Sequence, residues 1–413
     1  MKSLFNKYIE TSFVLKMFIG FLAGTLLALA IGEQATVVKP LGDLLINLLK
    51  LIAIPVIFLT VVLAVDQMNL PTLGRMGGKL ILYYIATTAA AVFIGLGLAF
   101  LVDPGKNLEL PNANVEKPDT PSFGDVLMNI IPDNIVAPFV NGDLMSILFL
   151  SVIIGIAIST MKFSSEEKMK GYGELLDRFF QALNELFYKL LNGVLLYAPI
   201  GIFGISASSF GGQGWETLQS LLSFTAVFYA GVAVLWALVY TTFLKLSGHP
   251  LKPFFSATKD AYTTAFFTSS SVATLPVAID TAKKAGISER VAHFTLPLGA
   301  VFNSDGGALR MGVSIVFAAN ITDLSLSVGD FFTIVVIGTL LSVGTAGVPA
   351  AGLVTLSAVL TMFNLPLEIV ALIAGVDVLI GMAGTASNVF GDIVGAAVVD
   401  KAEDRKGKTK KTA

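Results

Sequence analysis

The amino-acid sequence predicts an all-α membrane protein, and three observations support this fold class. Of the 413 residues, 54% are hydrophobic and only 14% are charged, whereas soluble domains carry about 25% charged residues. Long apolar runs recur along the chain, for example over 12–32, 81–101, 222–244 and 332–363. A helix needs about 20 apolar residues to cross the hydrocarbon core of a bilayer. Some of the runs are interrupted by polar residues, which plain membrane spans do not need.

The composition excludes several kinds of site. The sequence has no cysteine and only two histidines, His249 and His293, so disulfides and thiolate metal sites are excluded. Zinc enzymes and haem proteins are disfavoured because both classes depend on such ligands. The apolar run that follows Lys2 and Lys7 is long and has no evident small-residue cleavage site, so we expect a first span rather than a removed signal peptide.

Six spans are expected in the first 250 residues. Five of them lie near 11–32, 39–66, 77–101, 174–209 and 217–246. The fourth in chain order ends near residue 161 and is expected to be kinked by Pro132 and Pro138 near its start. Between the third and fourth spans, residues 103–121 form a polar loop that contains proline.

Lysine and arginine are distributed unevenly between the apolar runs. Both termini are basic, and the tail 401–413 alone contains six such residues, whereas the connections 211–216, 321–330 and 363–368 contain none. Cytoplasmic loops carry the excess of basic residues in membrane proteins. We therefore expect both termini in the cytoplasm and a multi-pass protein of the inner (plasma) membrane.

Two apolar segments contain a small polar interruption. Residues 268–276 (TSSSVATLP) interrupt the segment 250–283, and residues 342–349 (SVGTAGVP) interrupt the run 331–363. The first segment has basic residues on both flanks and the second has none, so each is expected to enter and leave through one membrane face. The pattern predicts two opposed re-entrant helical hairpins whose tips line a wet pocket with backbone groups. Full spans that pack through small residues remain the alternative.

A third interruption carries charge. Residues 303–310 (NSDGGALR) place a carboxylate, a carboxamide, two glycines and a guanidinium inside the apolar stretch 291–320. Each charge there costs about 2.5–3.5 kcal/mol unless it is paired or faces a cavity. Gly306 and Gly307 are expected to form an unwound joint, because glycine weakens a helix and frees backbone groups. Such a break is typical of an ion and substrate site in a transporter.

Several motifs, in this order, resemble the dicarboxylate/amino acid:cation symporter family, which includes the glutamate transporters and archaeal aspartate transporters. They are YAPIG at 197–201, TSSSVATLP at 268–276, PLGA at 297–300 leading into NSDG at 303–306, GTAGVP at 344–349, and Asn388 with Asp392. The likeness covers essentially the whole chain. It implies eight transmembrane helices plus the two hairpins, arranged as an inverted repeat that works by an elevator mechanism. It also implies a homotrimer in contact with membrane lipids.

The resemblance further implies a static scaffold and a moving transport domain. The scaffold would comprise residues 1–75 and 104–215, the second of which includes the outer loop. The transport domain would comprise residues 76–103 and 216–400, followed by the basic cytoplasmic tail 401–413. No nucleic-acid partner is expected.

Oxygen-bearing side chains point to cation sites. Asn388 and Asp392 are four residues apart and share one helix face. With Asn303 and the carbonyl of Gly299 they can form an all-oxygen cage, which suits a hard cation such as Na⁺. The resemblance implies two further sodium sites, one at Asp305 and one made of backbone carbonyls. The former would include Asn303, Tyr84, Thr87 and Thr88, and the latter the carbonyls of Val301, Ser342, Val343 and Thr345.

Alternatives remain open for both carboxylates. Asp392 can instead extend to water near the cytoplasmic end of its helix, and Asp305 can pair with Arg310. Ser304 stands where the family usually has methionine, between the cation sites. The number of coupled sodium ions, and the choice between Na⁺ and H⁺, are therefore open.

Two charges that bind amino acids in the family are absent. In amino-acid-transporting relatives, an aspartate of the last span binds the substrate ammonium and an arginine three residues later binds its side-chain carboxylate. Gly381 and Gly384 stand at these positions. A buried ammonium without a counter-charge would lose hydrogen bonds that contribute about 1.5–3 kcal/mol each, so we expect a substrate that lacks an amino group. The resemblance implies further substrate contacts at Ser270, Ser271, Gly307, Val348, Gly352, Thr385 and Asn388.

Arg310 departs from the family pattern, which has an uncharged residue at this place. A guanidinium here, with Gly384 leaving room opposite, predicts that Arg310 binds a substrate carboxylate in place of the missing arginine of the last span. Arginine can bind a carboxylate through two parallel hydrogen bonds. Arg310 can instead pair with Asp377, which lies seven residues before Gly384 on the same helix face. Both interactions can also hold, with Asp377 orienting Arg310.

The predicted function is sodium-coupled symport of a small carboxylate, with a C4-type dicarboxylate lacking an amino group as the favoured substrate. A sodium- or proton-coupled amino acid symporter is the alternative within this class, and an anion channel is the alternative outside it. An intramembrane protease would need a Ser–His pair or two facing aspartates, and His293 has no serine at a suitable spacing. We therefore expect no enzymatic activity.

Overall fold

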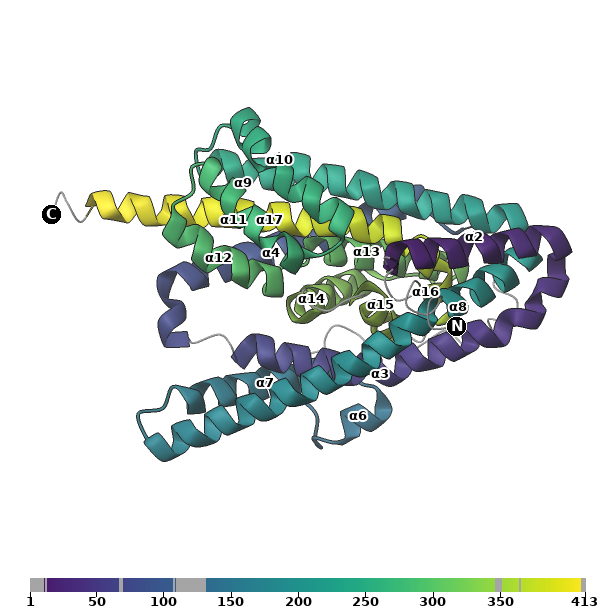
Figure 1. Ribbon diagram of the computed structural model, residues 1–413, viewed down its shortest axis with the longest axis horizontal. Helices are drawn as coiled ribbons and strands as arrows, with labels where there is room; N and C mark the ends of the chain where they lie inside the picture. The colour runs from purple at the N-terminus through teal and green to yellow at the C-terminus, as the bar shows by residue number, and fades with distance from the viewer. Residues whose placement is uncertain are drawn as a thin grey trace.

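The computed structural model describes residues 11, 13–66, 70–106, 108, 131–345, 351–363 and 365–409. Every regular element among these residues is a helix (Figure 1). The predicted all-α fold is therefore confirmed. Its physical basis is that a helix satisfies its backbone hydrogen bonds internally, which the lipid environment requires.

The first three predicted spans are confirmed as helices. They are α2 (Phe13–Ile31), α3 (Lys39–Asp66) and α4 (Leu70–Val102), with the short 3₁₀ helix η1 (Gly32–Val38) between α2 and α3. Gly32 begins the connection with φ +57°, a left-handed conformation that glycine adopts without steric cost. α4 begins earlier than the predicted boundary at residue 77, so its first two turns precede the apolar run.

The fourth span is shorter than predicted. α7 (Leu144–Lys162) follows Asp143, whose carboxylate accepts a hydrogen bond from the Ser146 amide. Pro138 lies in a separate short helix, α6 (Ala137–Asn141), which ends at Gly142 with φ +72°. Pro132 precedes both helices. The prediction of one span kinked by two prolines is therefore wrong, because a helix end and a new N-cap separate the prolines from the span.

The fifth and sixth predicted spans are joined without a non-helical loop. Helical backbone runs through α8 (Glu167–Val234), the π-helix η2 (Leu235–Tyr240) and α9 (Thr241–Leu246). Two parts of this stretch, Glu167–Ser208 and Trp215–Leu246, are each long and apolar enough to cross a membrane. Figure 1 shows them as two rods that meet at one end. The expected loop at 211–216 is instead a glycine-rich bend that keeps helical geometry.

Broken helices dominate the C-terminal half. α10 (Leu251–Thr268) and α11 (Ser271–Lys284) form a hairpin around Ser269 and Ser270, and the Ser270 hydroxyl caps α11. The helix break predicted at 268–276 is therefore confirmed. α14 (Val328–Thr345) and α15 (Ala351–Met362) flank residues 346–350, so the tip of the second hairpin lies outside the described residues. α16 (Glu368–Ala374) and α17 (Asp377–Thr409) follow.

The break between α12 (Glu289–Phe302) and α13 (Asp305–Ile321) differs from the predicted one. Asn303 and Ser304 leave helical geometry, whereas Gly306 and Gly307 lie in the first turn of α13. The prediction that the two glycines unwind is therefore wrong. Packing explains Gly306, because a Cβ there would overlap the backbone of Gly384 in α17. Small residues allow two helices to approach this closely in a membrane.

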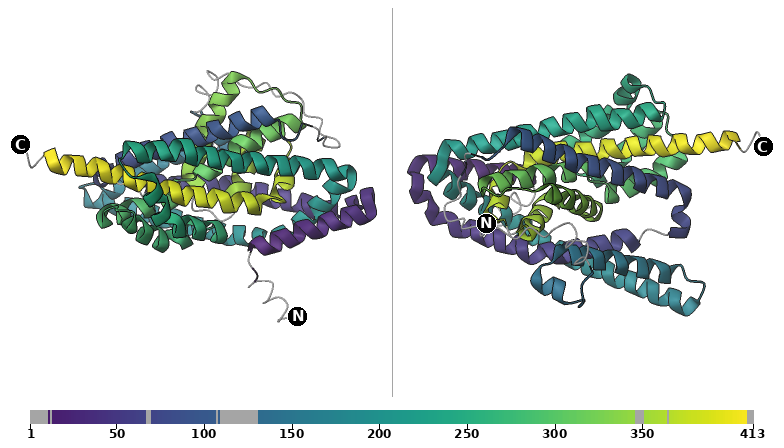
Figure 2. Two further views of the ribbon diagram at one scale, coloured as in Figure 1. Left: turned by 90° about the horizontal axis from the view of Figure 1, so that it is seen from above. Right: turned by 180° about the vertical axis from the view of Figure 1, so that it is seen from behind.

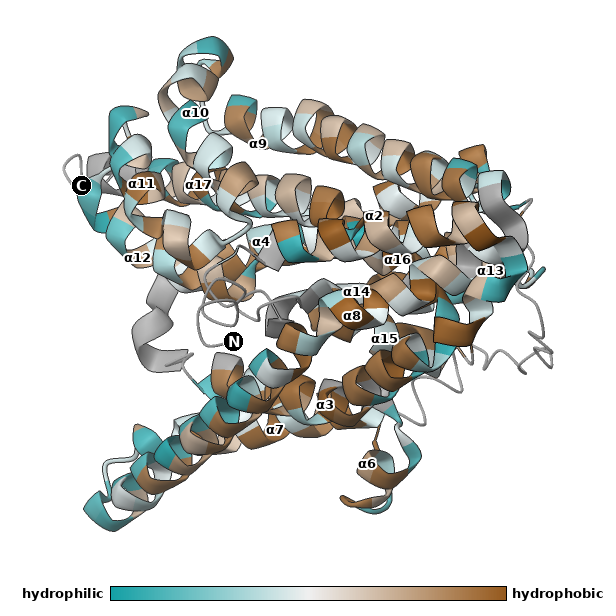
Figure 3. Ribbon diagram, turned by 45° about the vertical axis from the view of Figure 1, so that its right-hand side comes forward, coloured by the Kyte–Doolittle hydropathy of each residue, from teal (hydrophilic) through white to brown (hydrophobic). Residues whose placement is uncertain are grey.

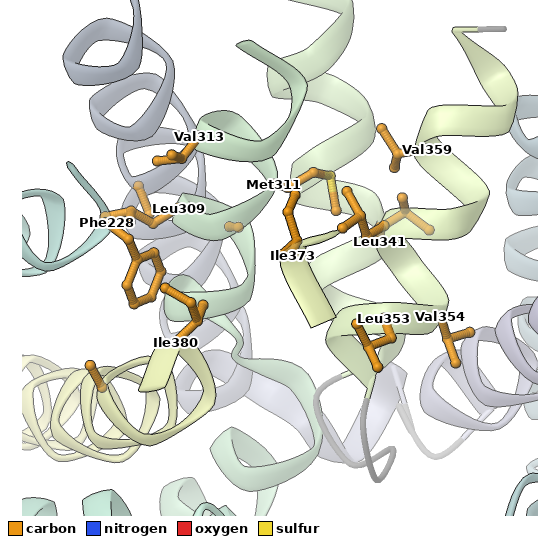
Figure 4. Close-up of a cluster of buried hydrophobic side chains, with 14 of the residues drawn as sticks. Phe228, Leu309, Met311, Val313, Leu341, Leu353, Val354, Val359, Ile373 and Ile380 are labelled. Carbon is orange, nitrogen blue, oxygen red and sulfur yellow. The ribbon is translucent and has the colours of Figure 1, made fainter. Parts of the chain in front are cut away.

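α13 is the central helix of the C-terminal half. It packs against α4, α8, α14 and α17, and 15 of its 17 residues are buried. Figure 4 shows Leu309 beside Phe228 on one side of α13 and Met311 near Leu341 on the other. α2, α3 and α7 pack instead on the long helix α8, and α7 also packs on α3.

The outer surface is apolar. Large side chains such as Leu29, Leu82 and Phe93 are about 70% exposed, and Figure 3 shows hydrophobic residues (brown) along most of the helices. Five stretches of the described chain are long and apolar enough to span a membrane: Leu15–Leu63, Met76–Val102, Glu167–Ser208, Trp215–Leu246 and Asp377–Glu403. Figure 2 shows the C-terminal end of α17 projecting beyond the other helices. The chain is thus a multi-pass membrane protein.

Gly20 and Gly24 allow α2 to approach α8. A Cβ on Gly24 would lie 2.9 Å from the Ser206 Cβ and would overlap the carbonyl of Phe203. We predict that Gly24→Leu lowers the stability of the detergent-solubilised protein by about 1–3 kcal/mol in thermal unfolding. Gly193→Leu is the control, because no described atom lies within 4 Å of a Cβ at Gly193. Equal losses for both variants would contradict the packing explanation.

Candidate functional site

The break at Asn303 and Ser304 is the point where polar groups converge. Hydrogen bonds join the residues around it to α4, η2, α14 and α17. Polar and ionisable residues inside a membrane bundle are costly and mark ion and substrate pathways. The break and its partners therefore form the candidate site.

Asp305 is fully buried at the start of α13. One carboxylate oxygen accepts hydrogen bonds from the hydroxyls of Thr88 (2.8 Å) and Thr87 (3.2 Å), and the other accepts one from Tyr240 (2.8 Å). These three donors offset part of the cost of burying a carboxylate. Arg310 pairs with a different carboxylate, so the alternative of an Asp305–Arg310 salt bridge is wrong.

Asn303 and Asp392 form a second polar pair at the break. The Asn303 side-chain nitrogen donates to Asp392 Oδ1 (2.9 Å) and to the backbone carbonyl of Asn388 (3.3 Å). Its side-chain oxygen is buried and has no hydrogen-bond partner among the described residues. A Cβ on Gly299 would lie 2.5 Å from Asp392 Oδ1 and would overlap the Tyr84 hydroxyl. Asp392 is only 3% exposed, so the alternative of a carboxylate extended to water is wrong.

The ends of α12 and α14 meet at the same break. The Ser342 hydroxyl donates to the backbone carbonyl of Ser304 (2.8 Å). Val301 lies in the last turn of α12, and Val343 and Thr345 lie in the last turn of α14. The last carbonyls of a helix have no partner within it and carry the negative end of the helix dipole. Of the carbonyl-bearing positions that the resemblance implies, Ser342 thus contacts the break directly, and α12 packs against α14.

Asn388 connects α17 to the start of α13. Its side-chain oxygen accepts a hydrogen bond from the Gly306 amide (2.8 Å), and its nitrogen lies 3.5 Å from the Ser304 hydroxyl. Thr385 and Gly307 are half-buried nearby on the same two helices. Hydroxyl, carboxamide and helix N-terminal amide groups are good partners for a carboxylate.

The remaining predicted substrate contacts lie on the hairpins. The Ser270 hydroxyl accepts a hydrogen bond from the Ala273 amide (3.2 Å) and thereby caps α11, which gives it a structural role. Ser271 is half-buried as the first residue of α11, a helix that packs against α17. Val348 lies outside the described residues, so its prediction has no structural counterpart.

Arg310 lies in the second turn of α13 and is 94% buried. Its Nη1 pairs with Asp377 at the start of α17. Nε and Nη2 are buried and have no hydrogen-bond partner in the described part of the chain. Gly352 of α15 packs directly on the guanidinium, because a Cβ there would overlap it. The pairing with Asp377 is thus observed, and it leaves two nitrogens of Arg310 without a partner among the described residues.

One face of α17 borders the whole site. Residues three, four or seven apart share a helix face, and the spacing places six residues on this one: Asp377, Gly381, Gly384, Thr385, Asn388 and Asp392. A Cβ on Gly384 would lie 3.7 Å from Phe228, and a Cβ on Gly381 would have no described atom within 4 Å. Between the Arg310–Asp377 pair and Thr385, the two positions on this face are thus glycines without a side chain.

The sequence analysis missed two tyrosines that support the site. Besides Asp305, Tyr240 donates to the backbone carbonyl of Ser387 (3.2 Å), and Tyr83 donates to that of Gly391 (3.0 Å). Both tyrosines lie in long apolar runs where an aromatic residue is expected as packing. The only available signal was a hydroxyl in a fully apolar context, since a buried hydroxyl needs a partner.

Comparison with known proteins identifies the family to which the chain belongs. The sequence matches the sodium:dicarboxylate symporter family over residues 13–402, a range that contains every residue of the site. The chain belongs to this family. The resemblance inferred from the motifs is thereby confirmed, and the protein is a transporter rather than an enzyme.

Relatives within the family resemble the chain over nearly its whole length. A C4-dicarboxylate transport protein of Rhizobium etli is 33% identical over 393 residues, which cover 92% of this chain and 87% of the relative. A protein of the same name from Bordetella avium is 29% identical over 415 residues, or 98% of this chain and 91% of the relative. Another from Bacillus subtilis is 29% identical over 393 residues, with 92% and 91% covered.

We predict that Tyr240→Phe destabilises the protein more than Tyr83→Phe. The first change removes a hydrogen bond to the buried Asp305 carboxylate, which contributes about 1.5–3 kcal/mol, and the second removes a bond to a neutral carbonyl, which contributes about 1 kcal/mol. Thermal unfolding of both purified variants in detergent measures the difference. A loss of stability for Tyr240→Phe no larger than that for Tyr83→Phe would contradict the hydrogen bond assigned between Tyr240 and Asp305.

Proposed function

We propose that this family member couples inward movement of Na⁺ to uptake of a C4-type dicarboxylate that lacks an amino group. The observation that carries the proposal is the guanidinium of Arg310, which has one nitrogen on Asp377 and two buried nitrogens without partners among the described residues. A buried donor without a partner costs about 1–3 kcal/mol, so a bound anion would relieve this cost. The relatives named C4-dicarboxylate transport proteins support the same substrate class.

The second carboxylate of the substrate would bind at the other end of the α17 face. Asn388 and the free amides at the start of α13 would bind it through N–H donors. Between this end and the Arg310–Asp377 pair, Gly381 leaves room for a short carbon chain, because a Cβ there would have no described atom within 4 Å. A small molecule with a carboxylate at each end matches this distribution of donors.

An amino acid matches the site less well. Its ammonium would need a carboxylate on the substrate side, and Asp377 already accepts from Arg310. The buried carboxylates of Asp305 and Asp392 lie at the break, on the side that the proposal assigns to the cation. The amino acid symporter is therefore the second candidate, and these contacts lend no support to an anion channel.

Na⁺ is the proposed coupling ion and is carried as cargo. Asn303 donates to Asp392, and its side-chain oxygen has no hydrogen-bond partner among the described residues. A cation there would therefore gain an oxygen ligand that no described proton donor occupies. Further oxygens come from Asp305 and from the helix ends at Val301 and Thr345. Na⁺ prefers oxygen ligands of this kind. Because Ser304 stands between the cation sites in place of the usual methionine, the number of Na⁺ ions carried with each substrate has to be measured.

We extend the proposal to the architecture implied by the resemblance. It has eight spans and two opposed re-entrant hairpins, α10–α11 and α14–α15, with both termini in the cytoplasm and a homotrimeric assembly. Residues 76–103 and 216–400 would move as a transport domain against the scaffold of residues 1–75 and 104–215. Supporting this division, Gly20 and Gly24 of α2 and Gly42 of α3 lie against residues 199–207 of α8, whereas Gly231, later in α8, lies against Leu309 of α13.

Uptake of radiolabelled succinate into proteoliposomes tests the proposed function. An inward Na⁺ gradient should drive accumulation, and unlabelled fumarate should compete while aspartate and serine do not. Accumulation of aspartate without competition by succinate would establish the amino acid symporter instead. Flux that persists without a sodium gradient would favour the channel.

Arg310 is predicted to control substrate affinity. Because the two hydrogen bonds of a carboxylate to a guanidinium contribute about 1.5–3 kcal/mol each, the double variant Arg310→Ala/Asp377→Asn should raise the KM for succinate by about 100-fold or more. The double change avoids leaving the Asp377 carboxylate buried without a partner. Arg310→Lys keeps the charge but loses the two parallel N–H donors of the guanidinium. Its KM for succinate should therefore lie between those of the wild-type protein and the double variant. A KM near wild type for the double variant would exclude Arg310 as the residue that binds a substrate carboxylate.

Asp392 is predicted to control sodium affinity. Asp392→Asn removes a charged oxygen ligand and should raise the Na⁺ concentration for half-maximal uptake by about tenfold or more. Asp330→Asn is the control, because Asp330 is equally buried but accepts from the Ser327 amide at the start of α14, away from the site. The same Na⁺ dependence for both variants would remove Asp392 from the cation site.

A further inference from the structure

Gly381 is a position of the site that packing does not explain. It is half-buried in the interior of α17, where glycine weakens a helix relative to alanine. Gly384 differs, since Gly306 of α13 lies directly against its backbone. At Gly381 a Cβ would meet no atom of the described residues within 4 Å. The helix is therefore weakened at Gly381 without a gain in packing against the described residues.

The space beside Gly381 has a charged neighbour with unused donors. Gly381 lies one helical turn after Asp377, on the same face of α17, and Asp377 holds the Arg310 guanidinium. Arg310 is 94% buried, and its Nε and Nη2 are unpaired within the described residues. Gly352 also packs on this guanidinium. A buried group that still lacks partners points to a ligand in this space.

The direction of the substrate follows from its two ends. The proposed carboxylate on Arg310 lies at the Asp377 end of the α17 face, and the other carboxylate lies toward Asn388. The carbon chain between them must therefore pass Gly381. Because no described side chain fills the space there, a substrate carbon that carries only hydrogen would leave it empty, and an unfilled space forfeits contacts.

We propose that the space beside Gly381 receives a substituent on the substrate's carbon chain, so that branched dicarboxylates bind better than succinate. The proposal rests on the proposed function and adds a specificity-determining residue to it. Filling such a space with one methyl group changes binding by about tenfold or more. Gly381 is thus retained for the volume it leaves to the substrate.

Inhibition of labelled succinate uptake by 2-methylsuccinate tests the proposal in proteoliposomes. For the wild-type protein, the inhibition constant of 2-methylsuccinate should be about tenfold below that of succinate. Gly381→Ala should remove this preference, because its Cβ would occupy the space that the methyl group fills. Gly97→Ala in α4 is the matched control, because Gly97 is also half-buried and has no described atom within 4 Å of a Cβ. It should change neither constant.

The outcomes distinguish failure of the role proposed for Gly381 from failure of the proposed function. Transport of succinate with weaker binding of 2-methylsuccinate by the wild-type protein overturns the role of Gly381 and leaves the proposed function intact. If Gly381→Ala weakens the binding of both acids equally, the role of Gly381 is also overturned, because the protein itself would then need the space. Absence of sodium-driven uptake of either acid by the wild-type protein overturns the proposed function itself. The wild-type comparison is decisive even if a variant fails to fold.

Discussion

A carboxylate buried inside an apolar helix bundle must be surrounded by donors, and Asp305 imposes this requirement on the rest of the structure. Thr88 reaches it from α4 and Tyr240 reaches it from η2, so the satisfaction of one charge fixes the position of α13 against two other elements. Because α13 begins at this residue, the amides of its first turn remain available, and Asn388 of α17 accepts from one of them. The break is thus both a structural joint and the origin of the site.

The same break joins the proposed cation side to the proposed substrate side. The backbone carbonyl of Asn388 accepts from Asn303, which also binds Asp392, while the side chain of Asn388 accepts from Gly306. Arg310 follows on the same helix, four residues after Gly306. Any displacement that a cation causes at Asn303 is therefore transmitted to Asn388 through direct contacts. Such shared residues provide a physical route for coupling between two ligands.

The sequence predicted the residues whose polar side chains are unusual inside a membrane. Asn303, Asp305 and Asp392 were identifiable because charge and carboxamide are costly in an apolar run, and the structure brings them to one place. The unwound joint was assigned to the wrong residues, because glycine propensity does not reveal that Gly306 is needed for the approach of α17. Tyr240 was missed because its role depends on a neighbour 65 residues away. The continuity of α8 also depends on tertiary packing, which single-sequence patterns do not contain.

The central claim is that cation and dicarboxylate bind at linked sites around one break in α13. Titration of succinate into the purified protein by isothermal calorimetry, at low Na⁺ and at high Na⁺ with choline keeping ionic strength constant, measures this linkage directly. The account predicts that Na⁺ tightens succinate binding by about tenfold or more, and that succinate tightens Na⁺ binding by the same factor. An affinity for succinate that is unchanged when choline replaces Na⁺ would contradict it.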